Sequence, residues 1–171
     1  MILVRHAESE WNRLYSRTRI DPGIPDPPLT DTGRRQAEAL AGILAPAGVR
    51  RLVASPYRRA LETASIVARA LDLEIAVEPL VRERCVFSCD LGSPPETLAA
   101  MWPELDFAHL PPQWWGEPAE SEASLARRCM IFHAKSTHLA DRHQVAVITH
   151  WGFIRALTGQ EVANVGWLRL P

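Results

Sequence analysis

Short apolar runs that alternate with stretches of helical periodicity are the feature of this sequence that most narrows its fold. Each run is too short for a helix and matches a buried strand. The predicted strands are 2–4, 51–54, 74–77, 145–148 and an edge strand at 165–170, and the predicted helices are 34–44, 56–71, 124–139 and 153–157. Strands that alternate with helices pair in parallel and are covered on both faces. We therefore predict an α/β fold, a three-layer α/β/α sandwich with a mostly parallel central sheet.

The length of 171 residues suits one domain, and we predict a single domain over residues 1–171. Residues 78–122 interrupt the alternation, because this stretch is rich in proline and lacks sustained periodicity. We interpret it as an irregular insertion that covers the site, and we expect its part at 85–122 to set substrate specificity. Its adjacent Trp114 and Trp115 are more typical of core coverage than of substrate binding.

Charge and cysteine content exclude several classes of function. The net charge of −1 gives no overall basic field for nucleic acid or an anionic membrane surface. No apolar run reaches the roughly 20 residues that span a bilayer. The cysteines, Cys85, Cys89 and Cys129, are odd in number and lack zinc-ligand spacing, so free thiols are expected. Because the N-terminus shows no secretory signal pattern, we expect a cytoplasmic protein.

Arginine supplies every basic residue except Lys135, and its planar side chain suits bidentate phosphate recognition. The adjacent pairs at 34–35, 50–51 and 127–128 are interpreted as solvated faces. Three histidines recur every five residues within 133–143, a spacing that scatters them around a helix axis. No metal site is predicted from them.

Polar residues follow three of the predicted strands directly. These segments are Arg5-His6-Ala7-Glu8, Ser55 to Arg59, and Thr149-His150. Because the carboxyl ends of parallel strands meet at one edge of a sheet, two histidines and at least two arginines are expected in one pocket. That combination suits a dianionic phosphate.

Phosphoryl transfer to histidine requires one neutral imidazole whose other nitrogen is fixed by a backbone carbonyl. Arginines stabilise the charge on the phosphoryl oxygens, and a carboxylic acid protonates the leaving oxygen. Glu83, after the third strand, is the candidate acid, with Glu62, Glu78 and Asp90 as alternatives.

Five segments in the same order resemble the motifs of the histidine phosphatase superfamily, the relatives of cofactor-dependent phosphoglycerate mutase. They are RHAESEWN at 5–12, LTDTGRRQA at 29–37, SPYRRALETA at 55–64, LVRER at 80–84 and THWGFIR at 149–155. The resemblance covers nearly the whole chain. It implies the α/β/α fold of that superfamily, with His6 as the nucleophile, Glu83 as the proton donor and His150 as a second catalytic histidine.

The resemblance also assigns binding roles. It implies that the phosphate is held by Arg5, Arg59, Asn12 and His150. Arg84 is either a substrate contact or an exposed salt-bridge partner. Two positions depart from the family pattern: Ala7 and Trp151 each replace a glycine, and Trp151 either narrows the pocket, as a substrate contact, or packs beneath it.

The sequence therefore predicts a metal-independent phosphatase that hydrolyses phosphomonoesters through a phosphohistidine on His6, with no cofactor. Its expected partner is a small phosphorylated substrate, with a phosphoprotein as an alternative, and neither nucleic acid nor a membrane. Mutase-type transfer to a phosphorylated sugar acid is the nearest rival, which the short chain disfavours. A non-catalytic phosphate- or phosphoprotein-binding module is the rival from another class. The sequence indicates no oligomeric state.

Overall fold

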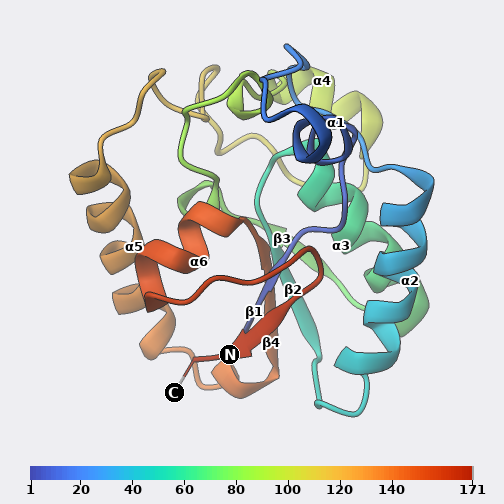
Figure 1. The fold of residues 1–171 in the computed structure, drawn as a ribbon. Helices are drawn as coiled ribbons and strands as arrows, with labels where there is room; N and C mark the ends of the chain where they lie inside the picture. Colours follow the sequence, from blue (N-terminus) through green and yellow to red (C-terminus); the bar gives the residue numbers. More distant parts are fainter. Residues whose placement is uncertain (171) are drawn as a thin grey trace.

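The computed structural model describes residues 1–170 and contains a five-stranded sheet in the order β3-β2-β4-β1-β5 (Figure 1). The strands are β1 Ile2–Arg5, β2 Arg51–Ala54, β3 Ile75–Val77, β4 Val145–Thr149 and β5 Trp167–Arg169. Four of them pair in parallel, and β5 pairs antiparallel to β1 at one edge. The predicted α/β fold with a mostly parallel sheet is confirmed.

Residues 1–170 also form six α-helices, which lie around the sheet (Figure 1). They are α1 Glu10–Thr18, α2 Asp31–Leu44, α3 Arg58–Leu71, α4 Pro95–Met101, α5 Glu122–Thr137 and α6 Trp151–Thr158. The core divides into two layers because neighbouring side chains of a strand point to opposite faces. Ile2 and Val4 pack with Leu61 under α2 and α3, whereas Leu3 packs with Phe153 under α5 and α6.

Two helices were absent from the sequence prediction. Helix α1 has only a short apolar stripe, Trp11, Leu14 and Tyr15, of which Trp11 alone is buried. Its start is fixed by a capping box between Ser9 and Asn12. Helix α4 is short, begins at a proline pair and buries only Leu98. It lies inside the segment that was interpreted as irregular. Thr30 caps the start of α2, because its side chain accepts a hydrogen bond from the backbone N–H of Gly33.

The structure tests two further interpretations, that the adjacent tryptophans cover the core and that the arginine pairs are solvated. Trp114 is buried in the core beside Tyr57, which confirms core coverage. Of the arginine pairs, 34–35 is exposed, as predicted. Arg128, in contrast, is only 5% exposed, so the solvated interpretation of 127–128 is wrong for this residue. It faces the core because it lies on the same side of α5 as Leu125 and Phe132.

The three cysteines are free, as expected, and all three are buried. Within residues 1–170, no three His, Cys, Asp or Glu side chains gather as a ligand set for a metal ion. The helices of this described part are also too short or too polar to cross a membrane.

Candidate active site

The order of the strands brings the predicted site segments together at the carboxyl edge of the sheet. Strand β4 lies between β2 and β1, so the residues that follow these strands are neighbours. The backbone N–H of His6 donates to the carbonyl of Thr149 at 2.8 Å. The ring centroids of His6 and His150 are 5.0 Å apart. The sheet thus places the two histidines side by side.

His6 is held in one tautomer. Its Nδ1 lies 2.7 Å from the carbonyl oxygen of Ala7, which only accepts hydrogen bonds, so Nδ1 carries the proton and Nε2 keeps its lone pair. The ring is 3% exposed. Burial, with the charges of Arg59 and Arg5, holds the pKa of His6 well below its usual range. At neutral pH the imidazole is therefore uncharged and its Nε2 can act as a nucleophile.

His150 is fully buried and precedes α6. Its Nε2 lies 2.8 Å from the hydroxyl of Ser55, which follows β2. Burial, followed by the charge of Arg59, keeps the pKa of His150 well below its usual range. Within residues 1–170 the buried Nδ1 of His150 and Nε of Arg5 have no hydrogen-bond partner. Both nitrogens can donate to an anionic oxygen, His150 in its Nδ1–H or protonated form.

The two arginines are supported by backbone and carboxylate oxygens. Arg5 Nη1 donates to the carbonyl of Val162 at 3.0 Å. Arg59 is 3% exposed, donates to the carbonyl of Cys89 at 2.6 Å, and forms an ion pair with Asp90 at 3.1 Å. Because an arginine stays protonated even when buried, this edge of the sheet carries two fixed cationic groups beside His6.

Glu83 reaches the site from the segment after β3. Its carboxylate accepts hydrogen bonds from the backbone N–H groups of Arg84 at 2.8 Å and Gly152 at 3.0 Å. Burial, followed by the negative charge of Asp90, raises the pKa of Glu83. Gly152 is required at this contact, since a Cβ there would lie 2.3 Å from Glu83 Oε1. Glu83 is thereby bound to Gly152, which follows His150 by two residues.

Each of the alternative acids is bound to another partner. Glu62 forms an ion pair with Arg58 at 2.7 Å. Glu78 accepts from the backbone of Leu80 at the start of a 3₁₀ turn. Asp90 pairs with Arg59 and accepts from two backbone N–H groups of its own loop. The geometry therefore favours Glu83 over these three carboxylates as the proton donor.

Asn12 is linked to His6 indirectly, through the side chain of Asn164. Its Oδ1 accepts from Asn164 Nδ2 at 3.2 Å, and the same nitrogen donates to the carbonyl of His6 at 3.0 Å. Sequence reasoning missed Asn164, which lies between α6 and β5 in none of the matched motifs. It also gave no role to Ser55, although the motif at 55–64 contains it.

The predicted substrate contacts Arg84 and Trp151 have other partners in the structure. Arg84 Nη1 pairs with the exposed Glu122 at 3.2 Å, which favours the salt-bridge interpretation. Trp151 begins α6 and lies 5.2 Å beneath the guanidinium of Arg155. Ala7 fits without strain, because it is fully buried and its N–H donates to the hydroxyl of Thr63 at 3.1 Å.

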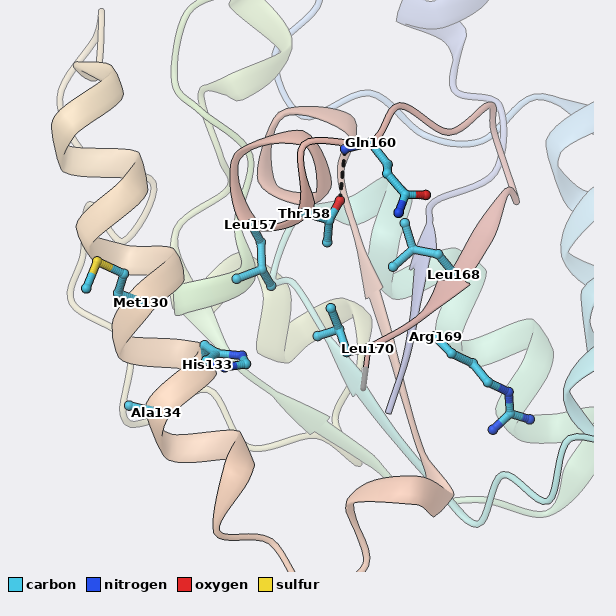
Figure 2. A pocket seen from close by; sticks show the side chains of 9 residues that line it. All are labelled: Met130, His133, Ala134, Leu157, Thr158, Gln160, Leu168, Arg169 and Leu170. Carbon is cyan, nitrogen blue, oxygen red and sulfur yellow. Dashed lines mark hydrogen bonds between the residues drawn. The ribbon is translucent and has the colours of Figure 1, made fainter.

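A cavity of about 610 Å³ lies away from these residues. Figure 2 shows its lining side chains on α5, on the end of α6 and on β5, with Met130, Leu157 and Leu168 among them. None of the predicted site residues lines it. We therefore locate the candidate active site at the histidine pair rather than at this cavity.

The fold and the cluster together define an α/β protein with a histidine-centred, cationic site suited to an anionic group. The family model of the histidine phosphatase superfamily (branch 1) matches residues 1–164. The chain belongs to this superfamily.

Curated relatives carry both phosphatase and mutase names. Phosphoserine phosphatase 1 of Hydrogenobacter thermophilus is 32% identical over 166 residues, which cover 92% of this chain and 73% of that protein. The "Probable phosphoglycerate mutase GpmB" of Photorhabdus laumondii is 41% identical over 81 residues, 47% of this chain. That match spans only 36% of the mutase-named relative. The relatives' names thus include both a phosphatase and a phosphoglycerate mutase.

Solved structures share the fold. A mycobacterial glucosyl-3-phosphoglycerate phosphatase in complex with VO3 has a TM-score of 0.68 and 22% sequence identity, over 98% of this chain and 88% of that chain. A structure described as a putative alpha-ribazole-5'-P phosphatase from Escherichia coli has a TM-score of 0.64 and 19% identity, over 97% and 87% of the two chains. At these identities the likeness shows the fold alone.

Proposed function

We propose that this chain is a metal-independent phosphatase that hydrolyses phosphomonoesters through a phosphohistidine intermediate on His6. The observation that carries the proposal is the state of His6. Its Nδ1 is fixed by the carbonyl of Ala7, its pKa is lowered by burial and by two arginines, and its Nε2 keeps a free lone pair. An imidazole in this state attacks phosphorus without a separate base.

In the first step, Nε2 of His6 forms a bond to phosphorus while the bond from phosphorus to the ester oxygen breaks. Arg5, Arg59 and His150 stabilise the charge on the phosphoryl oxygens. The departing oxygen takes the proton of Glu83, whose raised pKa favours the protonated form. Without that proton an alkoxide would have to leave.

In the second step, the Glu83 carboxylate takes a proton from water, and the water oxygen bonds to phosphorus. The bond between phosphorus and Nε2 breaks, and its electron pair returns to His6. Glu83 then carries a proton again, and inorganic phosphate leaves. The arginines supply the positive charge that this cycle needs, so the proposal includes no metal or cofactor.

We propose a small phosphorylated molecule as the substrate. The relative that matches 92% of this chain is named a phosphoserine phosphatase, which supports hydrolysis. Mutase-type transfer is the second candidate, because several relatives carry a phosphoglycerate mutase name, although they match less than half of this chain. A bisphosphoglycerate-dependent isomerisation assay separates the two.

The test is hydrolysis of p-nitrophenyl phosphate in EDTA by the parent protein and by His6→Ala. His133→Ala is the matched control, because His133 is an exposed helix residue outside the site. We expect turnover by the parent and the control and none by His6→Ala. After a quench during turnover, the parent is expected to carry acid-labile phosphate. Activity that survives His6→Ala, or that depends on added metal, would contradict the proposal.

A further inference from the structure

A buried guanidinium on α5 binds the peptide segment that carries Glu83. Arg128 is 5% exposed, and a charge so deeply buried needs strong partners. The carboxylate of Glu120 is the first partner: its Oε2 accepts from Arg128 Nη2 at 2.7 Å and its Oε1 accepts from Arg128 Nε at 3.2 Å. This pair neutralises the charge but leaves donors on the guanidinium free for other contacts.

Those donors point at three carbonyls of one short segment. Arg128 Nη1 donates to the carbonyls of Leu80 and Arg82, both at 2.8 Å, and Nη2 donates to the carbonyl of Glu83 at 3.4 Å. The remaining carbonyl in this run, that of Val81, accepts from the hydroxyl of Thr149 at 2.6 Å. Every carbonyl from residue 80 to residue 83 is therefore held by a side chain.

The segment needs such support because no strand or α-helix contains it. It consists of a 3₁₀ turn at Pro79–Val81 followed by extended backbone. Glu120 ties the far side of the same segment, since its carbonyl accepts from Arg84 Nε at 2.8 Å and its N–H donates to the carbonyl of Cys85 at 3.0 Å. The position of the Glu83 carboxylate thus depends on contacts made by α5 and by Glu120, which lies two residues before this helix.

We propose that Arg128, fixed by Glu120, is a positioning residue for the acid Glu83. This proposal rests on the proposed function, in which Glu83 protonates the leaving oxygen. Arg128 touches the backbone of the acid and not the reacting atoms. Its loss therefore displaces the carboxylate while His6, Arg5 and Arg59 stay in place, and protonation of the leaving group is the step that suffers.

A purely structural role for Arg128 makes a different prediction. A general loss of packing would lower the hydrolysis of all esters alike, whereas a displaced acid matters only where the leaving group needs a proton. The two roles are separated by comparing p-nitrophenyl phosphate, whose phenolate leaves unaided, with a simple alkyl phosphate, whose alkoxide does not.

The experiment measures kcat and KM for both substrates in Arg128→Gln and Arg128→Lys. The matched control is Arg127→Gln, since Arg127 is the exposed neighbour on the same helix. For Arg128→Gln we expect kcat for the alkyl phosphate to fall about 100-fold, the effect of a displacement of about 1 Å in a catalytic group. The p-nitrophenyl phosphate rate and both KM values are expected to change little. Arg128→Lys keeps the positive charge but lacks the planar guanidinium with its several donors, so it is expected to recover part of the loss.

Glu83→Gln serves as the reference, and Glu120→Gln is the second variant if thermal unfolding shows that Arg128→Gln does not fold. The parent and His6→Ala are measured first, so a failure of the proposed function is seen before Arg128 is judged. If Glu83→Gln is selective for the alkyl phosphate but a folded Arg128→Gln or Glu120→Gln loses both activities equally, or neither, the positioning role is wrong.

Discussion

Substitution of Gly152 by alanine tests how closely the structure fixes Glu83. An added Cβ would lie 2.3 Å from Glu83 Oε1 and 3.2 Å from its Cδ. Non-bonded heavy atoms are in contact at about 3.5 Å, so the carboxylate has to withdraw by about 1 Å. A side-chain terminus swings away more easily than backbone, and alanine is favoured over glycine in a helix by roughly 1 kcal/mol. We therefore expect the fold to survive while the acid moves.

The expected loss is confined to one step of the reaction. A shift of about 1 Å in a catalytic group lowers a rate by about 100-fold, which corresponds to about 2.7 kcal/mol in the activation barrier. The loss should appear in kcat for an alkyl phosphate and much less for p-nitrophenyl phosphate. Gly42→Ala is the matched control, because Gly42 also lies inside a helix and its added Cβ meets no atom within 4 Å.

Steady-state kinetics with both esters, together with a thermal unfolding curve, check this prediction. A folded Gly152→Ala that hydrolyses the alkyl phosphate at the parental rate would refute the reasoning, since it would mean that the carboxylate at this contact does not protonate the leaving group. Equal losses on both esters would refute it as well, because the defect would then lie outside proton transfer.

Three further outcomes are expected. Asp90→Asn removes the negative charge that raises the pKa of Glu83, so the alkaline limb of the alkyl phosphate rate should move to lower pH in a pH–rate profile; an unmoved limb argues against this charge effect. Gly33→Ala brings a Cβ to 2.1 Å from the backbone carbonyl of Glu8, and this overpacking should lower the free energy of unfolding in urea by about 1–3 kcal/mol, whereas an unchanged midpoint would show that the backbone relaxes freely. Arg59→Lys replaces a two-pronged donor by a point charge, so inhibition by inorganic phosphate should weaken by roughly 10- to 100-fold; an unaltered inhibition constant would remove Arg59 from the phosphate site.

The sheet was predictable because strands buried on both faces are continuous apolar runs in the sequence. The predicted strands at 2–4 and 145–148 match β1 and β4 within one residue. Helix α1 escaped prediction because it is polar around most of its surface. What fixes it is the capping box at Ser9 and the packing of Trp11 on Tyr15, whose rings stack at 4.4 Å. The capping box has no periodic signature, whereas the four-residue spacing of Trp11 and Tyr15 is helical and was a usable signal.

The histidines and arginines of the site were predictable because strand ends of a parallel sheet converge, and the motif order fixed which residues follow each strand. The supports of the site were harder to find. Arg128 stands three residues after Leu125 and four before Phe132, which places it on the buried face of α5, and this spacing was a usable signal. Asn164 had no such signal, because its contact with the carbonyl of His6 is a loop contact set by tertiary structure.

The proposed reaction needs a nucleophile without its proton and an acid that keeps its proton at the same pH. With the ordinary pKa values of 6.5 for histidine and 4.5 for glutamate, the histidine is protonated and the glutamate ionised between these two pH values, which is the opposite of what the reaction needs. Burial acts on both groups and disfavours the charged form of each, so it lowers the pKa of His6 and raises that of Glu83. The fixed charges act in the same directions, because Arg59 and Arg5 face the histidine whereas Asp90 is the main charge acting on the glutamate. The ion pair between Arg59 and Asp90 therefore lets one edge of the sheet hold two charges of opposite sign, each beside the group whose pKa it has to shift.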